Sequence, residues 1–198
     1  MAGRQDPATI SVNARAGALS LAVGAPLNLI LHMQGPTLGP LSYAAWLGVS
    51  FGALCFCEEM GAGRPLNRAG LVLFAAAFCA DTAAMLAVDP IVVARAHLLY
   101  AFAILGALVF WSVALMHRTQ TARAIGAIGT AVGGGALLLL VGAHLLLGAA
   151  TIMGFSQLFL TLAQPSRSAF AALAVFDSVL CLWCLSTSIL LWTGRIRS

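Results

Sequence analysis

The chain has 198 residues, of which 61% are hydrophobic and 8% are charged, and its formal net charge is +4. A soluble domain carries about 25% charged residues, so this composition excludes an ordinary soluble protein and indicates a multi-pass membrane protein. Every basic residue is an arginine in a short segment beside an apolar run, which favours a role in membrane topology over a nucleic-acid-binding surface.

Six apolar runs are long enough to cross the hydrocarbon core, which takes about 20 helical residues. In chain order, the predicted spans are 16–35, 41–57, 71–89, 91–116, 126–152 and 170–193. The sequence therefore predicts an all-α bundle of six transmembrane helices that forms a single domain over residues 1–198. Residues 1–15 are predicted to be a polar cytoplasmic leader, followed by a first span that stays in the membrane as a signal anchor.

The arginines predict the orientation of the spans, because cytoplasmic loops carry an excess of basic residues. With the N-terminus inside, the arginines on the cytoplasmic side are Arg4, Arg15, Arg64, Arg68, Arg118, Arg123, Arg195 and Arg197. Only Arg95 and Arg167 then fall outside. We therefore expect a multi-pass protein of the cell's inner (plasma) membrane with both termini in the cytoplasm.

Ionisable residues inside membrane spans are costly, and they usually mark a functional site or a satisfied pair. Five such residues occur in five different predicted spans: His32, Asp81, His97, His144 and Asp177. At a rise of about 1.5 Å per residue, Asp81 lies near mid-membrane and the other four lie toward the outer side. Together they predict a site in the outer half of the bilayer. The alternative for each residue alone is a structural hydrogen bond between helices, worth about 1 kcal/mol.

Helical spacing places these residues on small or polar helix faces, which we expect to turn inward around a cavity. In the first span, Asn28 and His32 are one turn apart. In the fifth span, the face consists of Thr130, Gly134, Leu137, Val141, His144, Gly148 and Thr151. In the sixth span, the face consists of Asp177, Cys181, Cys184 and Ser188.

Imidazoles from separate helices at similar depth suit heme b, whose iron takes neutral axial nitrogens and whose ring needs an apolar slot. The predicted ligands are His97 and His144, on consecutive antiparallel spans, and His32 is the alternative ligand. Asp81 and Asp177 are predicted to manage protons, orient a histidine or hold substrate. A small zinc or copper site made of histidine and aspartate is the other interpretation of the same cluster.

Two segments resemble parts of membrane heme proteins. The segment AHLLLGAATIMGFSQLFLTLAQPS (143–166) resembles the histidine-bearing helices of proteins related to subunit I of the heme–copper oxidases. The matching positions are His144, Leu145, Leu146, Leu147, Gly148, Thr151, Met153 and Gly154. This resemblance implies that His144 ligates heme.

The segment ARAHLLYAFAILG (94–106) looks like the heme-ligand segment of styrene oxide isomerase, a small helical heme-b enzyme. The resemblance implies that His97 ligates heme. In that family the ferric iron acts as a Lewis acid on an epoxide oxygen, and an asparagine soon after the histidine helps to hold the substrate. This chain departs from the pattern, with Ala103 and Leu105 in that region.

The cysteines and glycines have structural interpretations with open alternatives. The segment CLWC (181–184) resembles the redox pair of vitamin K epoxide reductase, but the sequence lacks the second cysteine pair that such enzymes carry in an outer loop. We therefore expect Cys181 and Cys184 to be core residues, with thiol redox chemistry or metal binding as alternatives. Cys79 is expected to be buried. Gly129 and Gly133 predict a tight helix pair inside the bundle, with self-association as the alternative.

These observations predict a heme-b protein that transfers electrons with quinone, or that carries out heme-assisted chemistry on a small apolar molecule. As an enzyme it would be an oxidoreductase or an isomerase. The alternative is a carrier or channel for a small solute or metal ion that uses the same cluster. A structural subunit of a larger membrane complex, or a homo-oligomer, is a third interpretation. The expected surroundings are the lipid bilayer, without nucleic acid.

Overall fold

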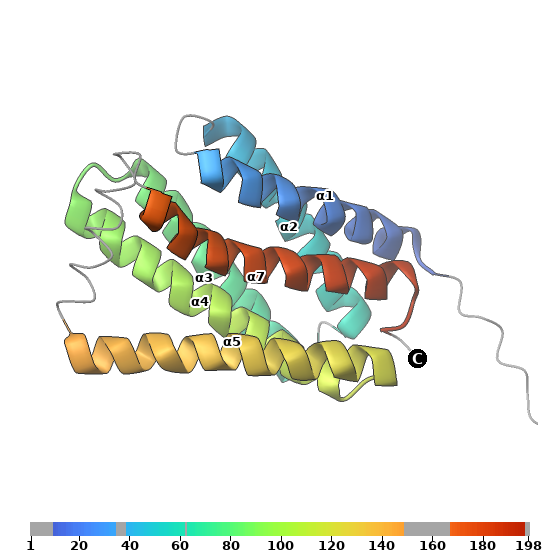
Figure 1. Ribbon diagram of the computed structural model, residues 1–198. Helices are drawn as coiled ribbons and strands as arrows, with labels where there is room; N and C mark the ends of the chain where they lie inside the picture. The colour runs from blue at the N-terminus through green and yellow to red at the C-terminus, as the bar shows by residue number, and fades with distance from the viewer. Residues whose placement is uncertain (1–9, 35–38, 62, 149–166, 197–198) are drawn as a thin grey trace, which may run out of the picture.

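The computed structural model describes residues 10–34, 39–61, 63–148 and 167–196, and the regular structure in these ranges is entirely α-helical (Figure 1). The helices are α1 (Val12–Gln34), α2 (Gly39–Met60), α3 (Pro65–Leu86), α4 (Pro90–Met116), α5 (Gln120–Leu147) and α7 (Arg167–Trp192). Five of them, α1 to α5, are long and apolar enough to cross a membrane. The described side chains of α7 add a shorter apolar segment, Ser178–Trp192. The expected all-α membrane bundle is therefore confirmed at this level.

All six helices begin earlier than the apolar runs predict, because a helix continues beyond its apolar part. Pro65 and Pro90 occupy the first turns of α3 and α4, where a missing backbone N–H costs nothing. The helix predicted from residue 126 begins at Gln120, because the side chain of Thr119 accepts a hydrogen bond from the backbone N–H of Ala122. That helix ends at Leu147, before Gly148, whose φ of +48° favours glycine. The predicted residues 149–152 lie outside the described residues.

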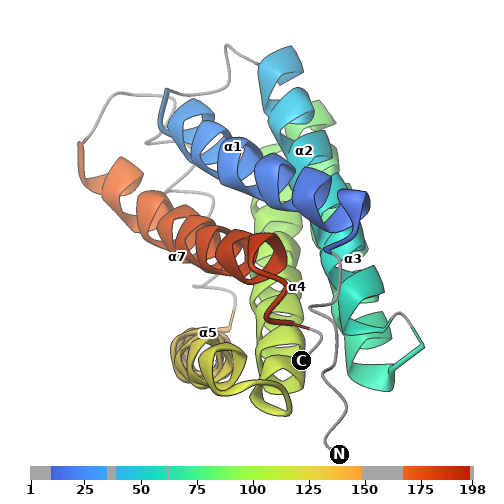
Figure 2. The ribbon, with the colours of Figure 1, turned by 90° about the vertical axis from the view of Figure 1, so that its right-hand side faces the viewer.

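The helices pack in two groups. The most extensive contacts join α1 to α2 and to α7 in one group, and α4 to α3 and to α5 in the other. Figure 2 shows α1 next to α2 and α7, and α5 next to α4. Short turns connect α2 to α3, α3 to α4 and α4 to α5, so these neighbours are antiparallel.

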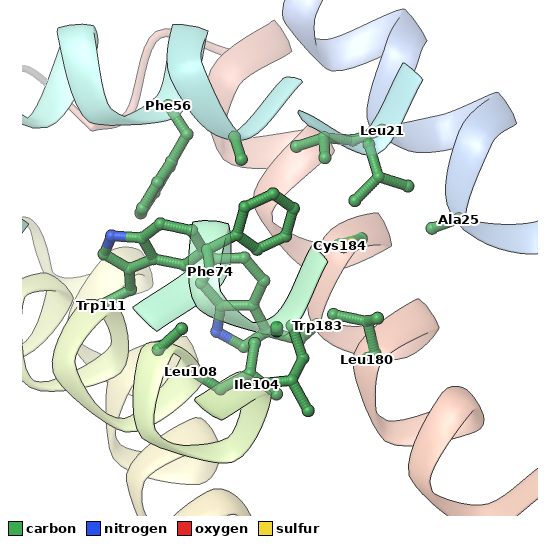
Figure 3. Packing of buried hydrophobic residues seen from close by; sticks show 14 of the residues in the cluster. Leu21, Ala25, Phe56, Phe74, Ile104, Leu108, Trp111, Leu180, Trp183 and Cys184 are labelled. Atoms are coloured by element: carbon green, nitrogen blue, oxygen red, sulfur yellow. The ribbon is translucent and has the colours of Figure 1, made fainter. Parts of the chain in front are cut away.

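Aromatic side chains fill the space between the two groups. Trp111 of α4 and Trp183 of α7 are stacked, with ring centroids 5.5 Å apart, and Phe56 of α2 meets both rings edge-on. Phe74 of α3 packs against Trp111 at 5.6 Å. Figure 3 shows Phe56, Phe74, Trp111 and Trp183 together in this core. Such rings bury a large apolar area, so they fix how the two groups sit against each other.

Small residues let α1 and α2 approach each other closely. A Cβ atom at Gly24 would lie 3.0 Å from the backbone nitrogen of Val49 and 3.1 Å from the carbonyl oxygen of Ala45. Gly17 and Gly52 also face α2 and α1, respectively, at distances that leave no room for a side chain. This is the small-residue packing typical of membrane helices, in which van der Waals contact replaces a hydrophobic driving force.

The described segments that carry most arginines meet at one end of the bundle, which we call the arginine-rich end. Ser11 donates a hydrogen bond to Glu59 at the end of α2 (2.8 Å), and Thr119 donates one to the carbonyl oxygen of Arg195, after α7 (2.8 Å). Arg95, near the start of α4, lies toward the opposite end. Among the described residues, Arg95 is therefore separated from the arginine-rich end, as the sequence predicts. The side of the membrane that each end faces stays a prediction.

Candidate functional site

The contact between α4 and α5 sets the register of the predicted heme ligands. A Cβ atom at Gly126 would lie 2.5 Å from the carbonyl oxygen of Ser112, and one at Gly133 would lie 3.8 Å from Cβ of Leu108. Gly129 also meets Ser112 with no space for a side chain. The predicted tight helix pair is therefore confirmed, and it joins α5 to α4 within one chain.

This register places His97 and His144 at one level. From the contact between Gly133 and Leu108, His144 lies eleven residues further along α5, and His97 lies eleven residues back along α4. Because the helices are antiparallel, both steps lead toward the same end, by about 16 Å at 1.5 Å per residue. Eleven residues are close to three turns, so each histidine lies near the helix face that carries the contact. Both residues are half-buried.

The two imidazoles have different environments. Nδ1 of His97 lies 2.9 Å from the carbonyl oxygen of Val93, one turn earlier in α4. In the neutral ring this nitrogen donates its proton, and the lone pair is then on Nε2. The ring of His144 meets the ring of Phe102 of α4 edge-on, with centroids 6.1 Å apart. Nδ1 of His144 is buried and has no hydrogen-bond partner among the described residues.

Asp81 lies close to the same level on α3. A Cβ atom at Gly106 of α4 would lie 3.0 Å from Leu73 of α3. Asp81 is eight residues beyond Leu73, and Leu98 is eight residues before Gly106, so Asp81 is level with the residue next to His97. The side chain of Asp81 is buried, with 4% exposed. The register thus brings the backbones of Asp81, His97 and His144 to a similar depth on three consecutive helices.

Other buried polar groups of this half of the bundle come from α1 and α2. Asn28 is 2% exposed and Trp46 is 1% exposed. Among the described residues, neither Oδ1 of Asn28 nor Nε1 of Trp46 has a hydrogen-bond partner. The ring of Trp46 packs against Phe74, Phe78 and Tyr100 at 5.7 to 6.1 Å. The close contact of Gly24 with Ala45 and Val49 brings Asn28, one turn further along α1, level with the turn of α2 that holds Trp46.

Asn28 and Trp46 are therefore an acceptor and a donor on neighbouring helices, both without partners in the described part of the chain. Each such buried group costs about 1–3 kcal/mol unless something binds it. The polar face of α1 indicated Asn28 from the sequence, but the sequence reasoning missed Trp46 and Tyr100. A tryptophan well inside a span, away from the interfaces where this residue usually lies, is the signal that would have identified Trp46.

Several predicted faces need correction or lie outside the described residues. On α5, Gly133 and not Gly134 faces α4, and a Cβ atom at Gly134 would meet nothing within 4 Å. The side chains of His32 and Asp177 and all of Thr151 lie outside the described residues, so their predicted roles stay predictions. Cys79 was expected in the core but is exposed on α3.

The predicted inward face of α7 is confirmed for its described members. Cys181, Cys184 and Ser188 are buried, and Ser188 donates a hydrogen bond to the carbonyl oxygen of Ala18 in α1 (2.8 Å). Both cysteines are thiols packed in the hydrophobic core. Their surroundings support the interpretation as core residues.

The donor set limits which metals these residues can hold. Within the described ranges, no group of three or more histidine, cysteine, aspartate or glutamate side chains is arranged to hold a metal ion. A zinc or copper site of the predicted kind therefore lacks a ligand set there, because such ions take three or four protein ligands. Heme iron, by contrast, needs only one or two histidines.

Compared with known proteins, the chain matches no family model, no curated protein and no solved structure. The two resemblances to heme proteins therefore stay predictions that rest on the quoted segments. The geometry of the described residues is the remaining basis for assigning a function.

Proposed function

We propose that this chain is an integral membrane protein that binds heme b between α4 and α5, with His97 and His144 as axial ligands. The observation that supports the proposal is the register of the two helices, which brings the backbones of His97 and His144 to a similar depth. His32, which follows Asn28 by one turn of α1, is the alternative ligand. The site is in the half of the bundle away from the arginine-rich end.

The chemistry of the donor set fits heme. The bond from Nδ1 of His97 to the carbonyl oxygen of Val93 orients the ring, as outer-shell bonds commonly do for metal-ligating histidines. The buried Nδ1 of His144 lacks a partner among the described residues, and a bond to iron would remove the cost of leaving it unpaired. Phe102 and Leu140 provide apolar surface beside His144. Figure 1 shows α5 separating from α4 toward this end of the bundle.

Bound heme b would supply one-electron transfer if both histidines ligate it, or an open coordination position if only one does. The residues of the chain would bind it, hold it in an apolar setting and manage protons. Asp81 is the buried carboxylate nearest in level, and we assign to it the proton transfer, with Asp177 sharing this role or holding substrate. The partner would be a quinone or a small apolar molecule, which reaches the exposed leucines of α5 through the lipid.

An absorption spectrum of purified protein from heme-replete cells tests the proposal. We expect a Soret band that is lost or shifted in the variants His97→Ala and His144→Ala. The matched control is His117→Ala, because His117 is an exposed residue at the arginine-rich end, where α4 stops. Colourless wild-type protein would refute the proposal, as would an equal change in all three variants.

A second candidate function rests on the acceptor of Asn28 and the donor of Trp46, which have no partners among the described residues. These groups complement a small neutral polar solute, and the solute would offset the cost of burying them. Pro26 lies two residues before Asn28 in α1 and removes the backbone hydrogen bond to the carbonyl oxygen of Ala22. Interrupted backbone hydrogen bonding of this kind is typical of substrate sites in transporters.

Liposome swelling separates the two functions. Glycerol or urea should enter liposomes that contain the protein faster than empty liposomes, and Asn28→Leu should slow this entry. Swelling at the rate of empty liposomes for both solutes would exclude a channel for neutral solutes. Because His144→Ala leaves Asn28 and Trp46 unchanged, that variant should swell like the wild type.

A further inference from the structure

Two arginines gather on the turn that ends α2 at the arginine-rich end. Nη2 of Arg118, from the turn between α4 and α5, donates a hydrogen bond to the carbonyl oxygen of Met60. A Cβ atom at the next residue, Gly61, would lie 3.7 Å from Nε of Arg64. The two guanidinium groups therefore lie beside consecutive residues of one turn, although the arginines are far apart in the sequence.

The positive charge at this turn is only partly offset. The last carbonyl groups of α2 contribute about half a negative charge, against two full positive charges. The carboxylates nearest in sequence are Glu58, which is exposed, and Glu59, which accepts the hydrogen bond from Ser11 on the α1 side. Burial lowers the pKa of Arg118, and the charge of Arg64 lowers it further. Their positions beside consecutive residues of one turn put the two cations close enough to repel each other.

Arg118 also has an unused donor. Its Nε is buried and has no hydrogen-bond partner among the described residues. Such an N–H costs about 1–3 kcal/mol when it is left without an acceptor. The guanidinium group has a fixed fork of donors that matches the oxygens of a phosphate, so an anionic oxygen is the natural partner of this group.

The position of the turn identifies the source of the phosphate. The apolar spans of α2, α3 and α4 end or begin at Met60, Pro65 and Met116, so the turn lies at the depth of the lipid headgroups. Exposed apolar side chains, such as Leu54 of α2 and Val72 of α3, continue from this end along the bundle. Basic pockets at membrane helix ends commonly bind anionic lipid headgroups.

We propose that Arg64 and Arg118 bind the phosphate group of an anionic phospholipid at the turn between α2 and α3. The phosphate accepts hydrogen bonds from the guanidinium groups of Arg118 and Arg64, and the acyl chains lie along the exposed apolar surface. The bound lipid offsets one of the two neighbouring positive charges and ties the turn that ends α2 to the turn between α4 and α5.

Lipid binding to the full chain in a nonionic detergent tests this proposal. Native mass spectrometry would count bound phosphatidylglycerol, with phosphatidylcholine of the same acyl chains and inorganic phosphate as comparisons. We expect the wild type to retain phosphatidylglycerol, and Arg64→Gln to bind it at least about tenfold more weakly, because a charged hydrogen bond is lost. The matched control is Arg123→Gln, which removes the same charge at the same end and should bind like the wild type.

Three outcomes would overturn the proposal. Equal retention of phosphatidylcholine would show that the phosphate site does not select an anionic lipid. Equal weakening in Arg64→Gln and Arg123→Gln would show a general effect of charge. Protection of the protein against thermal unfolding by inorganic phosphate as strong as that by phosphatidylglycerol would show a site for a free anion. Because Arg64 is exposed, its substitution should leave the fold intact, which the unfolding temperature without lipid checks directly.

Discussion

Replacing Gly126 with alanine should force α4 and α5 apart. The added Cβ atom would lie 2.5 Å from the carbonyl oxygen of Ser112 and 2.8 Å from the backbone nitrogen of Met116. Both are backbone atoms of α4, so no side-chain rotation relieves the contact. Favourable contacts between heavy atoms begin near 3.5 Å, so the helix axes must separate by about 1 Å at this position.

The size of the effect depends on two opposing terms. Overpacking of a well-packed interior costs about 1–3 kcal/mol. Alanine in place of glycine in a helix gains about 0.5–1 kcal/mol. Gly126→Ala is therefore expected to lower the free energy of unfolding by about 1–2 kcal/mol. Gly134→Ala is the matched control, because a Cβ atom there would meet nothing within 4 Å. Only the gain from replacing glycine with alanine in a helix then applies.

Unfolding of the two variants in mixed detergent micelles measures this difference. Intrinsic fluorescence is a suitable probe, because Trp111 and Trp183 are stacked in the core between the helix groups. We expect Gly126→Ala to unfold at a lower fraction of denaturing detergent than the wild type, and Gly134→Ala at the same or a higher fraction. The reasoning is refuted if Gly126→Ala proves as stable as Gly134→Ala.

Ser188→Ala removes the hydrogen bond to the carbonyl oxygen of Ala18, and the same unfolding assay should show a loss of about 0.6 kcal/mol, typical of hydrogen bonds between membrane helices; no loss would mean that the bond contributes nothing. Asn28→Leu removes a buried acceptor that has no partner among the described residues, so it should raise the free energy of unfolding by about 1 kcal/mol. A clear loss of stability would show instead that Oδ1 has a partner in the folded protein. Thr119→Ala removes both the N-terminal cap of α5 and the bond to Arg195, so it should cost about 1–2 kcal/mol, against no change for the exposed neighbour Gln120→Ala.

The sequence was sufficient to predict the helices because each one is an apolar run of membrane-spanning length. It was a poorer guide to where helices begin, since the first turns of α3 and α5 are polar and only Pro65 and the cap at Thr119 mark them. The predicted face of α5 was displaced by one residue because Gly133, Gly134 and Gly135 are equivalent in composition. Only the packing against Leu108 and Val109 distinguishes them.

The candidate site itself stays a prediction, and only the backbone register of its helices can be compared with the sequence. The similar depth of the His97 and His144 backbones is a consequence of two helices joined by a tight turn, which the sequence contains. Cys79 was placed in the core because apolar composition does not tell a lipid-facing residue from a buried one. Trp46 was missed because its ring counts as apolar, and only the three-dimensional packing shows that its N–H has no partner among the described residues.

The distribution of small residues along α5 explains why the proposed heme site lies where it does. Gly126, Gly129 and Gly133 let α5 lie directly against α4 in the half of the bundle next to the arginine-rich end. Beyond Gly133, the residues that face the bundle are larger, among them Leu137 and Leu140. One helix pair thus provides close packing at one end and larger apolar side chains at the other. The heme proposed above would lie among these larger side chains, because a cofactor cannot fit where Gly126, Gly129 and Gly133 hold the two helices in direct contact.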